Sequence, residues 1–499
     1  MRVLSMIELT LVRIVKFWLL CCSAIACATP NHFITRDGHR LMDGLDPLRF
    51  AGIHAPELHR IEDDARGKCE ADSRDWGQYF KWPTAQEQEN WIKALTRSGH
   101  RVMRIYVLSI EQSDDQDCGR ETHILRPEKP GGMPRLNESA MRHYDRMIAL
   151  AARYDLLLIL PFIDHWEWWG GRKQLAEFYG ETAADFYDVE SRTYAAYLSV
   201  IEQVITRTNH LTGRRYSDER TIMAWETGNE LKHTTADFLR ETAAYIKSLD
   251  SNHLVVDGTY SRINDYALED PNIDIISNHY YLNQNNATPD QVLIDLKKIG
   301  GKKAYLVGEF GLLPAQQIEE IMEAIVNTEH QGASAAGAFV WSFRGHRHEG
   351  GFYWHKDHAH YSYHLPGFPE GDANEEQRVI NMVRRAQAQM NGRDTPPPLP
   401  RPEPPRLHPI SDPAVINWLG APLGRFYDIE RSLHPNGPWR TLGEHISDGM
   451  NLFDPEKDAL FSDTDELDSG TTYYYRVSAQ NESGRSDPSN VVTYTPPID

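Results

Sequence analysis

Eight short apolar runs, separated by segments of helical or loop character, are the feature that most restricts how this chain can fold. Each run is only a few residues long and is apolar almost throughout, which is typical of parallel strands covered on both faces. Parallel strands need crossover connections, and a helix is the usual one. The runs occupy residues 50–54, 102–107, 156–162, 222–225, 254–257, 273–277, 304–307 and 337–341.

Helical patterns fill several of the intervals between these runs. In one interval Asn137 predicts a helix start, and Met141, Tyr144 and Ile148 follow at helical spacing. Eight such units within one region predict an α/β fold, a (β/α)8 TIM barrel. A doubly wound open sheet is the main alternative. No glycine-rich phosphate loop follows the first run, however, which disfavours its nucleotide-binding form.

A proline-rich stretch divides the chain into a large and a small part. It reads TPPPLPRPEPP over residues 395–405, and such a sequence forms neither a helix nor a sheet ladder, so we expect an extended, semi-rigid spacer. We therefore predict a barrel domain over residues 31–393, a linker over 394–408 and a second domain over 409–499.

The second domain has the texture of a small all-β sandwich. Strand-forming residues dominate segments 426–429 and 471–477, and turn signals such as Pro435-Asn436-Gly437-Pro438 separate them. We expect this domain to act in spacing or docking, and a carbohydrate-binding role is the alternative.

The N-terminal segment predicts an export signal. The basic residues Arg2, Arg13 and Lys16 precede an apolar run over 17–26 that is too short to span a bilayer, and Ala26-Cys27-Ala28 offers small residues for cleavage. We expect a signal peptide over residues 1–28 and a secreted or periplasmic protein. A lipid anchor at Cys27, as in an outer-surface lipoprotein, and a buried N-terminal helix are the alternatives. No other stretch predicts a membrane span.

Cysteine content and charge add two further expectations. Only Cys69 and Cys118 follow the N-terminal segment, and an oxidising compartment favours a disulfide between them over two buried thiols. The formal net charge of −20 leaves no excess of cations to neutralise phosphates, which argues against nucleic acid as a partner.

Two glutamates follow buried runs and are the main candidates for chemistry. Glu230 comes after the run 222–225 and Glu309 after the run 304–307. Strand ends of a barrel meet at one rim, and two carboxyl groups there are the minimum equipment for cleaving a glycosidic bond. Arg104 lies inside a buried run, where a charge needs a partner, and we expect Glu309 to be that partner. A surface carboxylate or a structural ion pair is the alternative for each glutamate.

Aromatic and polar residues gather at the ends of other runs. Sugar rings present apolar C–H faces, so aromatic side chains stack on them while polar groups bind the hydroxyls. We expect these residues to line a saccharide cleft, and the alternative for the tryptophans is burial in a core. The residues are His165, Trp166 and Trp169 after the third run, Asn229 before Glu230, His279 and Tyr281 after the sixth run, and Trp341 at the end of the eighth.

Six histidines crowd residues 346–364 and raise the question of a metal. Clustered imidazoles bind zinc in some proteins, but no cysteine joins them here. The interleaved Phe352, Tyr353 and Trp354 favour a loop that walls a sugar cleft. We therefore predict no metal and no cofactor, with a structural zinc as the alternative.

Together these residues resemble glycoside hydrolase family 5 of clan A, the retaining (β/α)8 hydrolases, over residues 33 to 390. Asn229-Glu230, His279-Tyr280-Tyr281 and Gly308-Glu309-Phe310-Gly311 carry the resemblance. It implies that Glu230 is the acid/base and Glu309 the nucleophile. It also implies roles for the surrounding residues: Asn229 holds the 2-hydroxyl of the sugar being cleaved, Arg104 and Tyr281 brace Glu309, His165 and His279 line the cleavage subsite, and Trp341 lies under the sugar.

Within the family, Trp166 followed by Gly170-Gly171 is most similar to the endo-β-1,4-mannanase branch. The chain departs from that branch at Leu231-Lys232, where Pro-Arg is common, and at His54, where Asn is common. The resemblance implies a retaining hydrolase of a plant-type β-1,4-linked polysaccharide, above all β-mannan. A β-glucanase, an exo-acting β-mannosidase or β-glucosidase, and a non-catalytic carbohydrate-binding barrel are the alternatives.

The C-terminal part has a resemblance of its own, to a fibronectin type III module. An early Trp418, a Tyr427-x-Ile429 strand and Tyr474-Tyr475-Arg476-Val477 followed by Asn481-Glu482-Ser483-Gly484 carry it.

Overall fold

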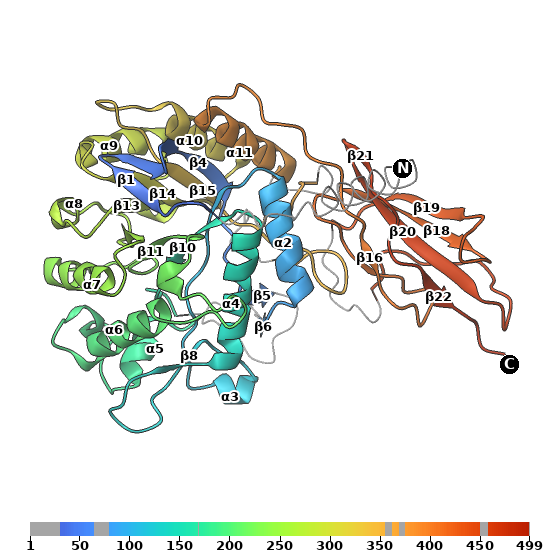
Figure 1. Cartoon of the computed structure of the whole chain (residues 1–499), viewed down its shortest axis with the longest axis horizontal. Coiled ribbons are helices and arrows are strands. Elements are labelled where there is room, and N and C mark those ends of the chain that lie inside the picture. The colour runs from blue at the N-terminus through green and yellow to red at the C-terminus, as the bar shows by residue number, and fades with distance from the viewer. Residues whose placement is uncertain are drawn as a thin grey trace, which may run out of the picture.

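Eight parallel strands form the central sheet, hydrogen-bonded in the order β4-β15-β14-β13-β12-β11-β10-β7 (Figure 1). Every expected run overlaps one of them, so the predicted TIM barrel is confirmed. The computed structural model describes residues 30–63, 79–167, 169–354, 362–368, 375–449 and 458–498. The strands are β4 Phe50–Ile53, β7 Val102–Arg104, β10 Leu157–Pro161, β11 Ile222–Glu226, β12 Leu254–Asp257, β13 Ile275–Tyr280, β14 Ala304–Gly311 and β15 Gly337–Trp341.

Backbone hydrogen bonds between the chain beyond β4 and the chain at the end of β7 close the barrel. The amide of Ala55 donates to the carbonyl of Arg104 at 3.2 Å, and the amide of Tyr106 donates to the carbonyl of Pro56 at 3.3 Å. The first and last strands of the sheet are thereby joined, and their carboxyl ends come to lie at the same rim as those of the other six.

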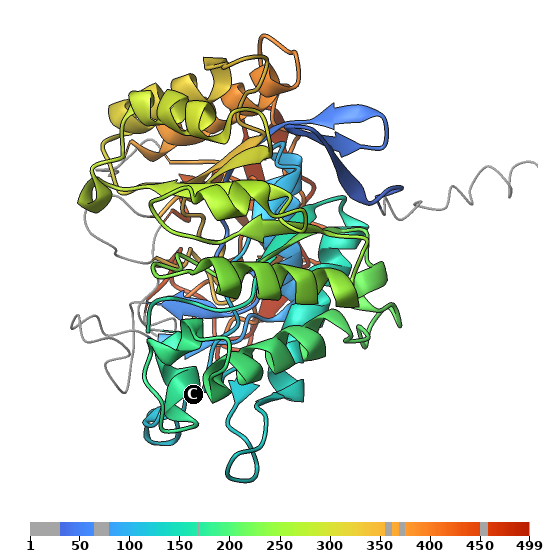
Figure 2. The ribbon, with the colours of Figure 1, turned by 90° about the vertical axis from the view of Figure 1, so that its left-hand side faces the viewer.

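Helices surround the strands, as Figures 1 and 2 show. The predicted start at Asn137 is confirmed, because its side chain accepts a hydrogen bond from the amide of Ser139 at the head of α4. The helices are α2 Ala85–Arg97, α3 Asp115–Cys118, α4 Glu138–Arg153, α5 Arg172–Glu177, α6 Arg192–Ile205, α7 Ala236–Leu249, α8 Asp265–Glu269, α9 Pro289–Ile299, α10 Ala315–Asn327 and α11 Glu376–Met390. No helix among the described residues is long and apolar enough to cross a bilayer.

A small antiparallel sheet covers the amino-terminal end of the barrel. It consists of β1 Ile34–Asp37, β2 Arg40–Asp43 and β3 Asp46–Leu48. Ile34, Leu41 and Leu48 are buried in the same apolar cluster as the inward-facing side chains of the barrel strands. Because this end is plugged, the carboxyl ends of the strands are where a substrate can reach the barrel interior.

The C-terminal part forms a β domain with a core of its own. A five-stranded antiparallel sheet and the two-stranded pair β16–β17 bury Trp418, Tyr427 and Tyr475 together. These strands agree with the expected all-β texture, whereas the likeness to a fibronectin type III module and the boundaries at 394 and 409 stay predictions. The strands are β16 Arg406–Leu407, β17 Trp418–Leu419, β18 Phe426–Ser432, β19 Arg440–Ile446, β20 Tyr473–Asn481, β21 Gly484–Arg485 and β22 Val492–Tyr494.

The proline-rich segment lies against the barrel instead of separating the two parts. It has neither helix nor strand before β16, as its prolines require. Leu399 is buried in the barrel's outer core. Glu403 accepts from Lys93 at 2.9 Å and from Arg97 at 3.0 Å, both on α2. The segment therefore fastens the β domain to α2.

A buried polar cluster joins the β domain to the barrel. The His346 side chain contacts Asn90 of α2 through Nδ1 and Asp448 of the β domain through Nε2, each at 3.1 Å. The Asn90 amide donates to the carbonyl of Gly420 at 2.6 Å, and the Trp91 indole donates to the carbonyl of His346 at 2.8 Å. The loop after β15 is thus held between α2 and the β domain.

Gly420 is the point at which this contact is tightest. A Cβ atom there would lie 2.2 Å from His346 Nε2 and 2.4 Å from Asp448 Oδ2. We predict that Gly420→Ala lowers the free energy of unfolding by about 1–3 kcal/mol, the usual cost of overpacking. Thermal and urea unfolding measure it. The exposed Glu466→Ala, also in the β domain, is the control and should stay within about 0.5 kcal/mol of the parent protein. Equal stabilities of the two variants would contradict the prediction.

Candidate active site

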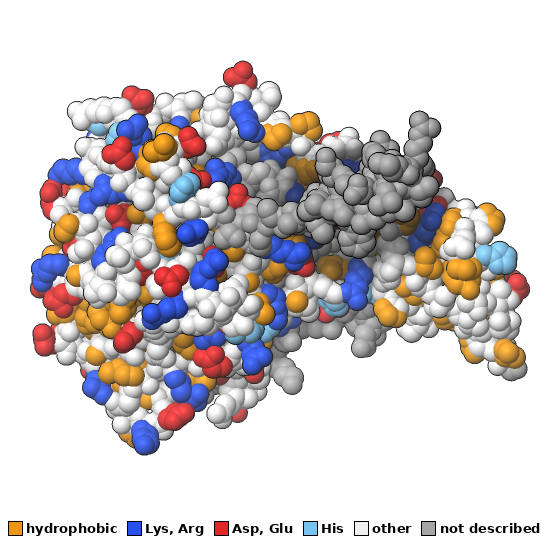
Figure 3. All heavy atoms as spheres, viewed as in Figure 1, with side chains coloured by type: hydrophobic (Ala, Val, Ile, Leu, Met, Phe, Trp, Pro, Cys, Tyr) orange, Lys and Arg blue, Asp and Glu red, His pale blue; other side chains and the backbone are white. Residues whose placement is uncertain are grey.

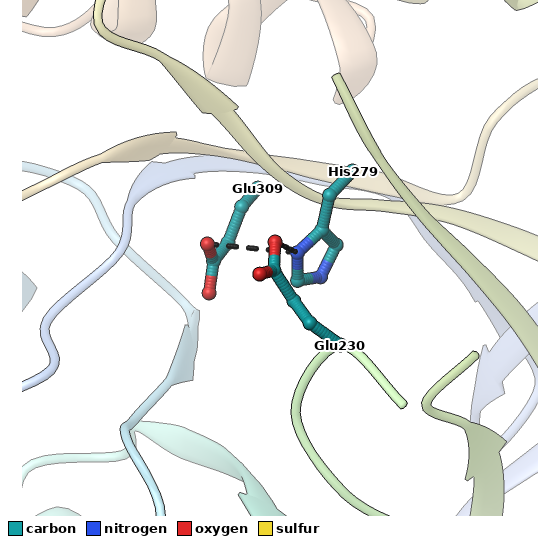
Figure 4. Close-up of side chains that lie close together, drawn as sticks. All are labelled: Glu230, His279 and Glu309. Atoms are coloured by element: carbon teal, nitrogen blue, oxygen red, sulfur yellow. Dashed lines mark hydrogen bonds and ion pairs between the residues drawn. The ribbon is translucent and has the colours of Figure 1, made fainter. Parts of the chain in front are cut away.

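Glu230 and Glu309 converge at the carboxyl end of the barrel, next to the imidazole of His279 (Figure 4). The Nδ1 atom of His279 lies 2.9 Å from Oε1 of Glu230 and 3.5 Å from Oε2 of Glu309. One oxygen of each carboxylate and this nitrogen all lie within 4.8 Å of one another. All three side chains are buried, so two acidic groups far apart in the sequence share one small, shielded space.

A β-bulge at Gly308 turns Glu309 into the barrel. Leu306 faces the barrel interior, whereas Val307 and Phe310 face the surrounding helices, so strict alternation would point residue 309 outward. The register with β13 instead shifts, such that Asn278 pairs with Val307 and His279 pairs with Glu309. The extra residue restores the inward direction at Glu309.

Only glycine fits at the bulge. A Cβ atom on Gly308 would lie 2.4 Å from Ser277 Oγ and 2.7 Å from His279 Nε2. The Gly-Glu pair at the end of this strand is therefore a geometric requirement: the missing side chain of residue 308 makes room for the imidazole that contacts residue 309.

Glu230 is held in an uncommon backbone conformation. Its φ is 54°, in the left-handed region that residues other than glycine seldom adopt and that is found most often at functional sites. The preceding Asn229 forms an isolated bridge with Asp164, and the following Leu231 forms another with Thr259. Contacts to the neighbouring strand ends on both sides thus fix the direction of the Glu230 side chain.

Arg104 is fully buried, and its guanidinium contacts four side chains of the site. Its Nε and Nη2 donate to the two oxygens of Glu226 at 2.7 and 2.9 Å, and Nη2 also donates to Asn229 Oδ1 at 2.9 Å. Its Nη1 donates to Glu309 Oε1 at 2.5 Å and lies 2.9 Å from His54 Nε2. The predicted pairing of Arg104 with Glu309 is confirmed, and Arg104 forms a second ion pair with Glu226 that was not predicted.

The protonation of Arg104 and His54 follows from these contacts. Burial by itself would lower the pKa of Arg104, but the charges of Glu226 and Glu309 outweigh burial and raise it. Since a guanidinium only donates, His54 Nε2 accepts and its proton lies on Nδ1. Burial and the charge of Arg104 lower the pKa of His54 well below its usual value, so His54 is a neutral acceptor here.

Glu309 is surrounded by donors. Besides Arg104, the Tyr281 hydroxyl donates to its Oε2 at 2.9 Å. Burial raises the pKa of Glu309 above its ordinary value, and the charge of Glu230 adds to this, whereas His279, Arg104 and the Tyr281 hydroxyl oppose it. Burial lowers the pKa of His279 to about 4. Arg104 and the Tyr281 hydroxyl thus stabilise the ionised form of Glu309.

Glu230 has a different environment. The Trp166 indole donates to its Oε2 at 2.5 Å, and no arginine or lysine lies within salt-bridge distance of it among the described residues. The Lys232 ammonium lies instead over the Trp166 ring at 4.2 Å and near the Tyr260 ring at 5.4 Å. One carboxylate therefore contacts a guanidinium, while the other contacts an indole and an imidazole.

A second buried carboxylate supports Asn229. Asp164 accepts from Asn229 Nδ2 at 3.0 Å and from the Tyr106 hydroxyl at 2.7 Å. Burial raises the pKa of Asp164 to about 7, although both donors oppose the shift. Asp164, Tyr106 and Glu226 were not among the residues expected to form the site. Glu226 carried a signal, because a carboxylate at the end of a buried strand needs a cation.

The structure separates the predicted aromatic residues into two groups. Trp166 lies beside Glu230, and Trp341 lies at the rim with its ring 5.0 Å from His54. Trp169, by contrast, is buried, and its indole donates to Glu62 at 3.0 Å. The expectation that Trp169 lines the cleft needs correction: it packs behind the site. His165 lies against Trp166, with ring centroids 5.2 Å apart.

The histidine-rich segment is only partly described. His346 joins the two domains, and His364 Nε2 contacts the carbonyl of Tyr353 at 3.0 Å. His355, His358 and His360 lie outside the described residues. Among those described, only Glu230, His279 and Glu309 form a group spaced to hold a metal ion. No histidine of the segment belongs to it.

Only one cysteine of the expected disulfide, Cys118, lies within the described residues. Cys118 ends α3 and is disulfide-bonded. Cys69 and the expected signal peptide lie outside the described residues, so the pairing and the export signal stay predictions.

Comparison with known proteins bears on this site. Residues 86–288 match a family model described as GH family 5 beta-mannosidase-like. The chain is similar to mannan endo-1,4-beta-mannosidase 1 of Arabidopsis thaliana, with 27% identity over 263 residues, which are 42% of this chain and 64% of that protein. It is also similar to a probable mannan endo-1,4-beta-mannosidase A of Aspergillus flavus, with 29% identity over 39% of this chain and 54% of that protein. The chain thus spans less than two thirds of either relative.

Solved structures share the fold. An endo-1,4-beta-mannanase from Rhizomucor miehei superposes with a TM-score of 0.54 at 18% identity, covering 71% of this chain and 99% of that one. An endo-beta-1,4-mannanase from Thermotoga petrophila superposes with a TM-score of 0.53 at 17% identity, covering 90% of this chain and 98% of that one. The barrel is therefore an architecture shared with these enzymes.

Replacing Glu226 tests how far the burial of Arg104 depends on this ion pair. We predict that Glu226→Ala lowers the free energy of unfolding by about 3–5 kcal/mol, because it leaves a buried guanidinium with half of its countercharge. Urea unfolding measures the change. Glu190→Ala, which removes an exposed carboxylate, should change stability by less than about 0.5 kcal/mol. A loss at Glu226 no larger than this control would mean that Arg104 does not depend on it.

Proposed function

We propose that this protein is a retaining β-glycoside hydrolase that cleaves β-1,4-linked mannan within the chain. The distance between the two carboxylates carries the proposal. Retaining enzymes hold their two carboxyl groups about 5–5.5 Å apart, and inverting enzymes about 6.5–9.5 Å apart. One oxygen of Glu230 lies within 4.8 Å of one oxygen of Glu309, which fits the spacing of retaining enzymes better than that of inverting ones.

The surroundings of the two glutamates support different roles. Glu309, held by Arg104 and Tyr281, attacks the anomeric carbon and forms a covalent glycosyl–enzyme intermediate. Glu230, which contacts the Trp166 indole and the His279 imidazole, donates its proton to the departing glycosidic oxygen. It then takes a proton from the water that releases the sugar.

Further residues position the sugar and the nucleophile. Asn229 is oriented through both ends of its amide, by Arg104 and by Asp164, and we assign it to the 2-hydroxyl of the sugar being cleaved. His279 lines the cleavage subsite, as we infer for His165, and Trp341 provides an apolar platform beneath the sugar.

Mannan is favoured as the substrate by the matches. The family model and the curated relatives carry mannosidase names, and the matched residues 86–288 include Arg104, Asn229, Glu230, His279 and Tyr281 but stop before Glu309. Endo action is favoured by the names of the curated relatives, which are mannan endo-1,4-beta-mannosidases. Because the N-terminal sequence predicts a signal peptide over residues 1–28, we propose that the protein is secreted or periplasmic.

Product analysis on a panel of polysaccharides tests the function. We expect β-mannan and glucomannan to be cut into oligosaccharides, and cellulose and mixed-linkage glucan to be poor substrates. Proton NMR during the first minutes should show the β-anomer of the new reducing end. Glu309→Ala should lower kcat by about a thousandfold or more, whereas the exposed Glu323→Ala should retain full activity. Initial release of the α-anomer, or an active Glu309→Ala protein, would reject the mechanism.

The pH profile provides a second test. Glu309 must be ionised to attack, so activity rises as pH increases through its pKa. Because the Tyr281 hydroxyl lowers the pKa of Glu309, we predict that Tyr281→Phe moves the acidic limb of kcat/KM to higher pH. It should also lower the plateau by about 10- to 100-fold, the worth of a hydrogen bond to a charged group. Tyr474→Phe in the β domain is the control. An unmoved acidic limb with Tyr281→Phe would contradict the assignment.

A further inference from the structure

Cationic side chains gather on the Glu230 side of the cleft. Lys232 and His233 lie two and three residues after Glu230, Arg172 begins α5, and Arg262 lies beyond β12. The charges of Arg172, Lys232 and His233 all act on the imidazole of His165, so these groups share one region. This gathering contrasts with the barrel face drawn in Figure 3, where Lys and Arg side chains are interspersed with Asp and Glu, and with the net charge of −20.

Lys232 is held in place by aromatic rings alone. Its ammonium lies 4.2 Å from the Trp166 ring centroid and 5.4 Å from that of Tyr260, and the side chain is only partly exposed. Within the described part of the chain it has no hydrogen-bond acceptor and no carboxylate within 4.0 Å. A partly buried ammonium with three unused donors binds an anionic acceptor more strongly than a neutral hydroxyl.

Arg172 and Arg262 likewise have no carboxylate partner among the described residues. Arg172 Nε donates to His165 Nδ1 at 3.0 Å, and its guanidinium lies 5.6 Å from the Tyr187 ring. Arg262 donates to the carbonyl of Thr234 at 3.0 Å. Burial, followed by the charges of Arg172 and Lys232, lowers the pKa of His165 to about 3. His165 is therefore neutral, and the positive charge of the region is that of Lys232 and the two arginines.

The neighbouring lysine shows that this loop can also pair its cations. Lys173, next to Arg172, binds Glu167 at 2.8 Å on the surface. Lys232, by contrast, contacts the rings of Trp166 and Tyr260 and has no carboxylate within 4.0 Å among the described residues.

The position of the cluster assigns it to one end of the substrate. Trp166 contacts Glu230, whereas Glu309 is held from the other side by Arg104 and Tyr281. In double displacement the acid donates to the oxygen of the departing sugar. Lys232, which lies over the indole that contacts Glu230, is therefore on the side of the leaving-group part of the chain.

We propose that the leaving-group side of the cleft binds a saccharide with an anionic substituent, a carboxylate or a sulfate, which is bound by Lys232 with Arg262 and Arg172. The proposal rests on the proposed function for the direction in which the substrate lies. It makes the preferred substrate an acidic mannan-type chain and gives the substitution of Leu231-Lys232 for the common Pro-Arg pair a role in specificity.

Matched oligosaccharides test this. Three manno-oligosaccharides differ only at C6 of the first leaving-group residue, which carries a hydroxyl, a carboxylate or a sulfate. We expect kcat/KM for one of the anionic forms to exceed that for the hydroxyl form by up to about fivefold at low salt, as for a partly exposed ion pair. The advantage should shrink as ionic strength rises, because the Debye length falls to about 8 Å at 0.15 M and becomes shorter still at higher salt. The form with the larger advantage identifies the anion.

Charge-removing variants locate the site. Lys232→Gln should reduce the anionic-to-neutral ratio about fivefold, and Arg262→Gln should reduce it in the same direction. Lys173→Gln, which removes an equal charge already paired with Glu167, should leave the ratio unchanged. A ratio of one or less in the parent protein, or a ratio that Lys232→Gln does not lower in a normally folded protein, would overturn the proposal.

Binding separates this proposal from the function on which it rests. Affinities of the same oligosaccharides for the Glu309→Ala protein, measured by calorimetry, need no catalysis. Cleavage of the neutral form without tighter binding of either anionic form would overturn the anion site and keep the hydrolase. Tighter, Lys232-dependent binding of an anionic form without cleavage of any form by the parent protein would support the anion site and overturn the hydrolase.

Discussion

A single buried guanidinium connects every part of the site. Arg104 donates in two directions, to Glu226 and Asn229 on one side and to Glu309 on the other, and burial together with the charge of Arg104 keeps His54 neutral. A charge in a barrel interior is tolerated only when all of its donors are satisfied. The network therefore fixes Asn229, the residue before Glu230, relative to Glu309 before any ligand binds. Such preorganisation is what electrostatic catalysis requires.

The two carboxylates differ because their neighbours differ. Glu309 contacts a guanidinium and a phenol, and Glu230 contacts an indole and an imidazole. Both are buried, so burial alone cannot assign their roles. The division arises from where the cations are: Arg104 lies beneath Glu309, whereas Lys232 is drawn over Trp166 and away from Glu230. Two similar acids at short distance can thus perform opposite tasks in one reaction.

The sequence predicted the barrel well because its strands are short, apolar and widely spaced, which few other folds permit. It also predicted the pairing of Arg104 with Glu309, since a charge within an apolar run implies a countercharge. Glu226 was missed because the expected strand stopped one residue before it. Trp169 was misplaced because nothing local separates a tryptophan of the cleft from one of the core. The contact of His346 with Asp448 joins distant parts of the chain, and no local pattern reveals such a partner.

The strand that carries Glu309 contains one residue more than a regular ladder would. Were residue 308 paired regularly instead of bulged, the inside–outside alternation set by Leu306 and Val307 would run through it. Glu309 would then face the surrounding helices and be buried without a countercharge. Any change that made the ladder regular at residue 308 would thus remove this carboxylate from its neighbours His279 and Arg104, while leaving every acidic residue of the chain in place.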